Sequence, residues 1–290
     1  MKKKVFACSD IHGHYQETLQ ALQEAGWDEN NENHLLIVCG DIFDRGRESW
    51  SVYKWLKRLT DEGKAIVTKG NHDDFLIDFM GELDFNHTYG YNDYAYLSGW
   101  NGVNETIDDF LHSTSEYKMF ALMYAGEENT WDAFVKYARK EIKKENPGIV
   151  DWLNNLPDYY ETKNYIFTHG SIDPFCYDWK NPYSEDEEFY DKPLDIRWRK
   201  CHWDDGTFLT KEHKNTDKTV VVGHFGTGDL RSKWQVDTRD INDYSILKLG
   251  KKIFLDGCTI LTKKVNVLVI DEEELLENNN NEKEVNENGK

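Results

Sequence analysis

The chain has few basic residues for its size and no long apolar run. Its 290 residues include 35 Lys and Arg against 54 Asp and Glu, which gives a formal net charge of -19. Broad binding to a phosphate polymer or to an anionic membrane surface needs clustered basic side chains. We therefore expect neither a long nucleic acid nor a membrane as a partner. No apolar segment approaches the length of a membrane span, and the apolar residues 5–8 are too few for a signal peptide, so we expect neither feature.

Cysteine is scarce and follows no recognisable spacing. The chain has five cysteines without a Cys-x-x-Cys pair, and the odd number leaves one unpaired in any disulfide scheme. This pattern indicates reduced, mostly buried thiols and predicts a cytoplasmic protein. The residues are Cys8, Cys39, Cys176, Cys201 and Cys258.

The composition is nevertheless that of a folded protein with an atypical end. Hydrophobic residues make up 39% of the chain and aromatic residues 14%, which is enough to build a sizeable core. Residues 271–290 differ, because they combine eight Asp and Glu with only two Lys and a run of four Asn. We predict one folded domain over residues 1–270 and a disordered acidic tail over 271–290 that serves solubility.

Short apolar runs alternate with helical patterns in the first quarter of the chain. Residues 5–8, 35–39 and 65–68 have the composition of buried strands. Residues 14–25 and 50–62 place apolar side chains at helical spacing, and each is followed by a glycine that suits a helix end. The order predicts an α/β fold that begins with a βαβαβ unit of parallel strands.

Helical periodicity replaces the strand signal between about residues 74 and 157. It is seen at residues 104–111, 116–124 and 131–144, which predicts a helical insertion or cap. A long irregular stretch, 171–193, is typical of a lid or a substrate wall. Strands are predicted again at 165–168, 219–222, 245–249, 252–255 and 265–270, the later ones spaced closely enough for antiparallel hairpins.

Polar residues suited to metal binding follow most of the predicted strands. In an open α/β sheet the carboxyl ends of parallel strands share one edge, so these residues would converge there. They offer too many donors for one divalent ion, which takes about four to six. Two cations that share Asp41 could activate water and clamp a phosphoryl oxygen. The candidate ligands are Asp10, His12, Asp41, Asn71, His169 and His224.

Each motif is a weak signal by itself. Asp-x-His-Gly and Gly-Asn-His-Asp also suit a turn or a helix cap, and a lone histidine after a strand is more often structural than a ligand. The run from Gly40 to Gly46 is stronger, because folding alone does not require two carboxylates and an arginine between glycines. The ordered set of motifs favours a metal site, because the probability that all five occur at successive strand ends by coincidence is on the order of a per cent or less.

Together the motifs resemble the signature of calcineurin-like metallophosphoesterases. Within these, the chain is most similar to the phosphoprotein phosphatase branch, which includes bacteriophage-type serine/threonine phosphatases and symmetrical diadenosine tetraphosphatases. The resemblance implies a central β-sandwich of mixed sheets flanked by helices, with residues 1–270 as a single catalytic domain. It rests on Asp10-x-His12, Gly40-Asp41-x-x-Asp44-Arg45-Gly46, Gly70-Asn71-His72-Asp73, His169-Gly170 and Gly223-His224.

The resemblance also implies roles for these residues. Asp10, His12 and Asp41 would hold one metal ion. The second ion would be held by Asp41, Asn71, His169 and His224. Mn²⁺ is the expected metal, with Fe and Zn²⁺ as alternatives, because such ligands suit all three.

The catalytic groups follow from the same resemblance. Arg45 would bind the substrate phosphate, and His72, oriented by Asp44, would protonate the leaving oxygen. A hydroxide bridging the two metals would attack phosphorus in line, without a phosphoenzyme.

The chain departs from the family pattern in three places. Phe225 and Gly226 follow His224, where many metallophosphoesterases have a further histidine, and this favours the phosphatase branch. Asp73 stands where the branch usually has Glu. The family's second phosphate-binding arginine has no clear counterpart. We favour Arg199, with Arg197 and Lys200 as alternatives, although an exposed basic patch is an equally good interpretation of that segment.

These features predict a metal-dependent hydrolase of phosphomonoesters, above all of phosphoserine or phosphothreonine in proteins. The alternative substrate is a dinucleoside polyphosphate such as diadenosine tetraphosphate, whose adenine could stack on aromatic residues of the insertion or of residues 175–183. A non-catalytic metal-binding scaffold is the least favoured hypothesis, because it has no need of both His72 and Arg45.

Overall fold

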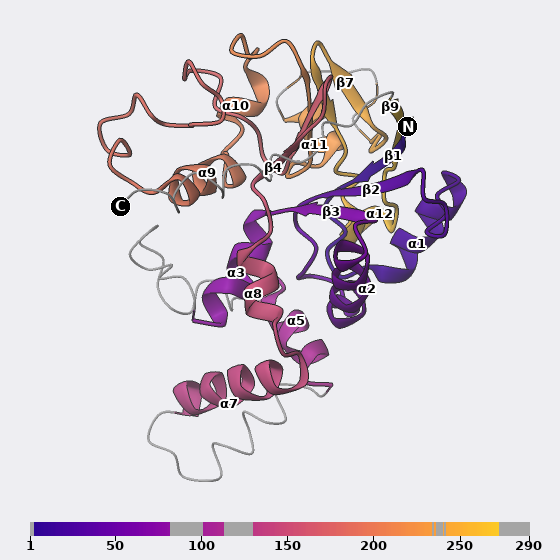
Figure 1. The fold of residues 1–290 in the computed structure, drawn as a ribbon, viewed down its shortest axis with the longest axis vertical. Helices are drawn as coiled ribbons and strands as arrows, with labels where there is room; N and C mark the ends of the chain where they lie inside the picture. The colour runs from indigo at the N-terminus through magenta and orange to yellow at the C-terminus, as the bar shows by residue number, and fades with distance from the viewer. Residues whose placement is uncertain are drawn as a thin grey trace, which may run out of the picture.

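The computed structural model describes residues 3–81, 101–112, 130–233, 235, 240 and 242–272. Within these residues two sheets pack face to face, and helices cover both outer faces (Figure 1). In the described part of the chain, no helix is long and apolar enough to cross a membrane.

The first sheet has the strand order β3-β2-β1-β9. Its strands are β1 (Lys3–Cys8), β2 (His34–Cys39), β3 (Ala65–Thr68) and β9 (Leu268–Glu272). The first three are parallel and are connected by α1 (Tyr15–Glu24) and α2 (Ser49–Asp61), which confirms the predicted βαβαβ unit. Strand β9 pairs antiparallel with β1 from the far end of the chain.

The second sheet has the strand order β4-β5-β6-β8-β7. Its strands are β4 (Tyr159–Glu161), β5 (Tyr165–Thr168), β6 (Thr219–Val222), β7 (Leu247–Leu249) and β8 (Lys252–Phe254). Strands β5, β6 and β8 are parallel, whereas β4 and β7 pair antiparallel with β5 and β8. The β7–β8 hairpin was predicted, but β9 does not join it, because β9 completes the other sheet instead.

Alternating side chains of the strands form the core between the sheets. Val5 and Ala7 of β1 are buried there together with Phe167 of β5 and Val221 of β6. Phe6 points the other way, since successive residues of a strand face opposite sides. Both faces of these strands are therefore buried, which explains why the sequence shows continuous apolar runs rather than alternation.

Helices cover the outer face of each sheet. One apolar cluster extends from the outer face of the first sheet to α1, α2, α3 (Asn71–Phe79), α5 (Val103–Phe110), α7 (Thr130–Glu145) and α8 (Ile149–Asn154). The second sheet packs against α9 (Leu194–His202), α10 (Thr207–Thr210) and α11 (Thr227–Ser232). The short helix α12 (Thr259–Thr262) follows β8. Helix α7 lies at the end of the molecule away from the sheets (Figure 1).

The structure refines several of the predicted boundaries. Helices α5 and α7 match two of the predicted helical segments, and the third, 116–124, lies outside the described residues. The helical region begins at Asn71, inside the Gly-Asn-His-Asp motif, rather than near residue 74. Residues 171–193 contain neither helix nor strand, as predicted.

Strand β9 continues two residues past the expected domain boundary at 270. Asp271 lies opposite Lys4 of β1, a cross-strand pair of opposite charges that supports the extension. The remainder of the predicted tail lies outside the described residues.

The packing between the sheets predicts a large effect for Phe167→Ala. Phe167 is fully buried between the sheets, so truncation leaves a cavity that both sheets line. We expect the free energy of unfolding to fall by about 3–5 kcal/mol in urea denaturation. Val269→Ala, at a position that is 39% exposed, is the control and should cost about 1 kcal/mol or less. Equal effects of the two substitutions would contradict this account of the core.

Candidate active site

The loops that follow six strands meet at one end of the sandwich. Asp10, Asp41 and Asn71 follow β1, β2 and β3, and His169, His224 and Asp256 follow β5, β6 and β8 of the other sheet. The sequence predicted the convergence but placed it at the edge of a single open sheet. The structure instead confirms the β-sandwich of mixed sheets that the resemblance implied: each sheet contributes three parallel strand ends, and the candidate site lies between the two groups.

The backbone turns sharply at the candidate ligands. Asp10, His12, Asp41 and His224 have φ of 51°, 43°, 52° and 71°, in the left-handed region that non-glycine residues seldom adopt. Such conformations persist only where the surroundings hold them, and they are concentrated at functional sites. The turns direct these side chains into the space between the strand ends.

One glycine beside the ligands is required by close packing. A Cβ atom on Gly70 would lie 2.3 Å from the Asp41 carboxylate oxygen Oδ1 and from its backbone nitrogen. Only a residue without a side chain allows the loops after β2 and β3 to approach this closely.

The first donor group consists of Asp41, Asn71, His169 and His224. Each of these side chains directs one nitrogen or oxygen atom toward the others. The Nδ1–H of His169 donates to the carbonyl of Cys39 at 2.9 Å, so in the neutral ring Nε2 carries the lone pair. That Nε2 lies 2.9 Å from Asn71 Oδ1, 3.1 Å from His224 Nδ1 and 3.2 Å from Asp41 Oδ1. The fold thereby fixes the tautomer that presents Nε2 to the group.

His224 is oriented in the same manner. Its Nε2–H donates to the carbonyl of Asp204 at 2.8 Å, and its Nδ1 lies 2.9 Å from Asn71 Oδ1. Backbone carbonyls that fix the outer nitrogen are the usual support of metal-binding histidines. Because the facing atoms of Asn71, His169 and His224 all carry lone pairs, the group fits a cation.

The electrostatics of the first donor group also call for positive charge. Burial would lower the pKa of His169, but the Asp41 carboxylate raises it to about 10. Burial, followed by the charge on His169, lowers the pKa of His224 to about 3. The group therefore has room for one positive charge beside Asp41, which a proton or a metal ion can supply.

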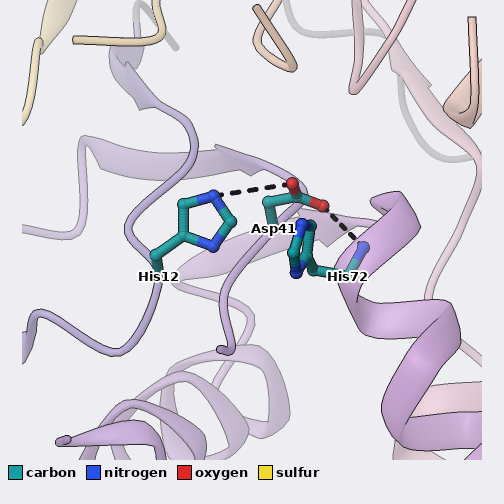
Figure 2. A group of neighbouring side chains, drawn as sticks. All are labelled: His12, Asp41 and His72. Carbon is teal, nitrogen blue, oxygen red and sulfur yellow. Dashed lines mark hydrogen bonds and ion pairs between the residues drawn. The ribbon is translucent and has the colours of Figure 1, made fainter. Parts of the chain in front are cut away.

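The second donor group consists of His12, Asp41 and His72, whose ligand atoms lie within 4.8 Å of one another. Figure 2 shows His12 and Asp41 facing one another, with 3.6 Å between Nε2 and Oδ2. The Nδ1–H of His12 donates to the carbonyl of Phe43 at 2.8 Å, so its Nε2 also carries a lone pair. His12 and Asp41 thus lie as the resemblance implies for one metal ion.

Asp10 is buried but holds a different partner. Its two carboxylate oxygens accept the backbone N–H of His224 at 3.2 and 3.0 Å. Burial, followed by the nearby Asp256 carboxylate, raises the pKa of Asp10 well above its usual range. Asp10 therefore links the loops after β1 and β6, and its part in metal binding stays a prediction.

The predicted acid pair is present and buried. Asp44 Oδ2 accepts the Nδ1–H of His72 at 2.8 Å, and both side chains are almost fully enclosed. The Arg45 guanidinium donates to His72 Nε2 at 2.9 Å and to His12 Nε2 at 2.8 Å. Arg45 therefore bridges two histidines of the second donor group with its forked donors.

Of the three candidates for the second phosphate ligand, only Arg199 is directed at the helix that carries Asn71 and His72. Arg199 is buried, with Nε 3.1 Å from Asp74 Oδ2 of α3. Arg197 donates to the carbonyls of Lys192 and Pro182. The ammonium group of Lys200 lies 4.5 Å from the centre of the Phe189 ring, against the irregular loop. Because Arg199 is buried, the exposed-patch interpretation does not describe it.

Sequence reasoning did not assign a role to Asp73. Its Oδ2 accepts the N–H groups of Gly70 at 2.8 Å and Asp41 at 3.1 Å, and its Oδ1 accepts the N–H of Ile42 at 3.1 Å. Asp73 thus ties the loop after β2 to the start of α3. The signal was present in the motif, because Asp is a frequent first-turn residue that binds free backbone N–H groups.

A model of the calcineurin-like phosphoesterase family matches residues 3–249. The chain belongs to this family. The match spans all the motifs from Asp10 to His224, and it confirms the assignment made from them.

Two kinds of curated phosphoesterase are among the relatives of this family member. A symmetrical bis(5'-nucleosyl)-tetraphosphatase of Buchnera aphidicola subsp. Acyrthosiphon pisum is 32% identical over 129 residues, which cover 43% of this chain and 44% of the relative. Shewanella-like protein phosphatase 1 of Plasmodium berghei is 25% identical over 180 residues, covering 58% of this chain and 39% of the relative. The chain thus spans less than half the length of these curated relatives.

A solved structure of similar architecture is the cold-active protein-tyrosine phosphatase of a psychrophilic Shewanella species. The two share 18% sequence identity with a TM-score of 0.46, over 94% of this chain and 76% of that one. A similarity of this degree does not bear on the substrate.

The donor groups predict metal binding that can be measured without activity. Millimolar Mn²⁺ should raise the thermal unfolding midpoint of the full chain, because a ligand that binds only the folded state stabilises it. In His224→Ala one oriented donor is lost, and we expect the shift to fall to less than half. His112→Ala, at a position exposed to solvent, is the matched control and should keep the full shift. An equal shift in all three proteins would contradict the assignment of the first donor group.

Proposed function

We propose that the chain is a metal-dependent phosphoesterase that hydrolyses phosphomonoesters in the manner of a serine/threonine protein phosphatase. The observation that carries the proposal is the position of Arg45, which bridges His12 of the second donor group and His72 of the acid pair. A candidate metal ligand, a candidate phosphate-binding guanidinium and a candidate proton donor therefore lie side by side. A structural metal site requires neither of the last two.

The donor groups would hold two divalent cations. His12, Asp41 and Asp10 would serve one, and Asp41, Asn71, His169 and His224 the other. When bound, such ions supply charge neutralisation and water activation for attack on phosphorus. Mn²⁺ is the first choice, and the ligand types also suit Fe and Zn²⁺.

Arg45 would change partners when substrate binds. Its guanidinium spans two unprotonated imidazole nitrogens, and neither is as strong an acceptor as a phosphate oxygen. A bidentate contact with two phosphate oxygens would orient the phosphoryl group and release His12 Nε2 and His72 Nε2. Both nitrogens then face the reacting space.

His72 would supply the proton for the leaving group. Its Nδ1–H is held by Asp44, so Nε2, the atom that faces Arg45, is the position that would take up the proton once Arg45 has moved to the phosphate. As the P–O bond breaks, that proton passes to the departing alkoxide or phenoxide oxygen. The buried Asp44 carboxylate stabilises the charged imidazole before the transfer and keeps its orientation.

The surroundings of the irregular loop favour a cationic peptide over a polyphosphate. Phe175, Tyr183 and Phe208 line a cavity of about 310 Å³ together with the acidic Glu185 and Asp186. These carboxylates would repel a polyphosphate chain and attract basic side chains near a phosphorylated residue. Asp204 connects this cavity to the first donor group, because its carboxylate accepts the N–H of Phe208 and its backbone carbonyl accepts the Nε2–H of His224.

A dinucleoside polyphosphate remains the second candidate substrate. The tetraphosphatase of Buchnera aphidicola carries that activity in its name. The rings of Phe175 and Tyr177 are 64% and 90% exposed, which leaves them free to stack on a base. Most aromatic rings of the predicted helical insertion, which the sequence also offered for stacking, lie outside the described residues.

Substitution of His72 tests the proposed chemistry. Wild type with Mn²⁺ should hydrolyse phenyl phosphate, and His72→Asn should lower kcat by about 10²–10⁴-fold, the usual contribution of a general acid. Asp41→Asn should abolish turnover. His112→Asn is the control and should match wild type. Inactivity of wild type across phosphoesters and metals would refute the proposal.

The substrate class requires a separate comparison. We expect kcat/KM to be highest for a phosphoserine peptide with flanking Lys and Arg. It should be about tenfold lower for a peptide with flanking Asp and Glu, because an electrostatic preference of about 1.4 kcal/mol gives a tenfold ratio. Diadenosine tetraphosphate should be a poor substrate. If chromatography shows that diadenosine tetraphosphate is converted rapidly to ADP as the sole product, the symmetrical tetraphosphatase assignment would be favoured instead.

A further inference from the structure

Helix α5 contacts the loop that carries the proposed acid pair. The Thr106 hydroxyl donates to Asp44 Oδ1 at 2.7 Å and accepts the backbone N–H of Asp44 at 2.8 Å. Thr106 is fully buried. A two-way contact of this kind fixes both the backbone and the carboxylate of Asp44.

The loop needs such support because its backbone is strained. Asp44 and Arg45 have φ of 69° and 65°, two successive non-glycine residues in the left-handed region. The residue before α5 also braces this loop, since the carbonyl of Gly102 accepts the N–H of Arg45 at 3.3 Å. A Cβ on Gly102 would lie 2.2 Å from the Arg45 nitrogen, so only glycine allows this approach.

The two oxygens of Asp44 have separate partners. Oδ2 accepts the Nδ1–H of His72, and Oδ1 accepts the Thr106 hydroxyl. Among the residues that the structure describes, Thr106 is the hydrogen-bond donor to Oδ1, and without it the carboxylate would be free to rotate away from His72. Ser49 supports the arrangement, with its hydroxyl oxygen 3.2 Å from that of Thr106.

We propose that Thr106 is a positioning residue of the acid pair, which holds the Asp44 carboxylate in the orientation that aims His72 at the leaving oxygen. The inference rests on the proposed function, because it assumes that His72 delivers the proton. It makes helix α5 of the helical insertion part of the support for the acid pair, although α5 holds none of the candidate metal ligands.

The leaving group separates this role from a merely structural one. Phenoxide needs a proton as the P–O bond breaks, whereas 2,4-dinitrophenoxide leaves without one. In Thr106→Val we expect kcat for phenyl phosphate to fall by about 10–100-fold, within the usual range of general-acid catalysis. The kcat for 2,4-dinitrophenyl phosphate and both KM values should change by less than about threefold, since the carbonyl of Gly102 still holds the backbone of Arg45, the proposed phosphate-binding residue.

Serine provides the conservative rescue. Thr106→Ser keeps the hydroxyl and should restore kcat for phenyl phosphate to within about threefold of wild type. The matched control is Thr162→Val, which removes another buried hydroxyl that accepts a backbone N–H, in the hairpin between β4 and β5. This control should lower stability without changing the ratio of the two rates.

A double-mutant cycle with Asp44→Asn tests whether Thr106 acts through Asp44. In that background Thr106→Val should have no further effect on phenyl phosphate hydrolysis, because the orientation to be preserved is already lost. Thr106→Ala is measured alongside, and circular dichroism with the Mn²⁺-induced midpoint shift verifies the fold of each variant.

Several outcomes would overturn the inference. These are equal losses on both phosphates, an additive effect in the Asp44→Asn background, and a Thr106→Ser variant as slow as Thr106→Val. An inactive wild type would refute the proposed function instead, so the two failures are distinguishable.

Discussion

Asp41 is the buried carboxylate on which the whole site depends. Its Oδ1 accepts the backbone N–H of His72 at 2.9 Å and lies 3.2 Å from His169, while Oδ2 faces His12. One side chain therefore joins the two donor groups. Burial alone would raise its pKa, but the charges of His169 and then His72 hold the pKa of Asp41 well below its usual range. A permanently ionised carboxylate between histidines is what a shared position between two cations requires.

The sandwich positions this carboxylate through a rigid backbone. The strands that end at the site are buried on both faces, so their ends cannot shift without disturbing two apolar layers. Asp73 fixes the loop of Asp41 by accepting its N–H, and Gly70 allows the adjacent loop to approach. The cost of the left-handed turns at Asp41 and its neighbours is thus met by packing and hydrogen bonds elsewhere.

The net charge of -19 has to be considered together with where the charges lie. Part of the acidity surrounds the donor groups, where divalent cations would reverse the local sign. Another part lines the cavity beside the irregular loop, where Glu185 and Asp186 accompany aromatic rings. An acidic protein can therefore accept a small phosphoester and still exclude long anionic polymers. The proposed preference for basic sequences around the phosphate rests on the same distribution.

The sequence by itself determined most of the strands, although not β4, and it supplied the candidate ligands as a prediction. The predicted ranges of β3, β5 and β6 agree with the structure residue by residue, because short apolar runs between polar turns encode buried strands locally. The motifs located His169 and His224 correctly at the strand ends, since strand, turn and ligand are adjacent in the chain.

Only the tertiary structure decided how distant segments meet. The division into two sheets and the pairing of β9 with β1 depend on contacts between the two ends of the chain, which no local pattern encodes. The contact of Thr106 with Asp44 joins residues 62 positions apart, and Thr106 looks like any other threonine of a helical pattern. Periodicity reports which face of an element is buried, but packing alone selects the partner that it is buried against.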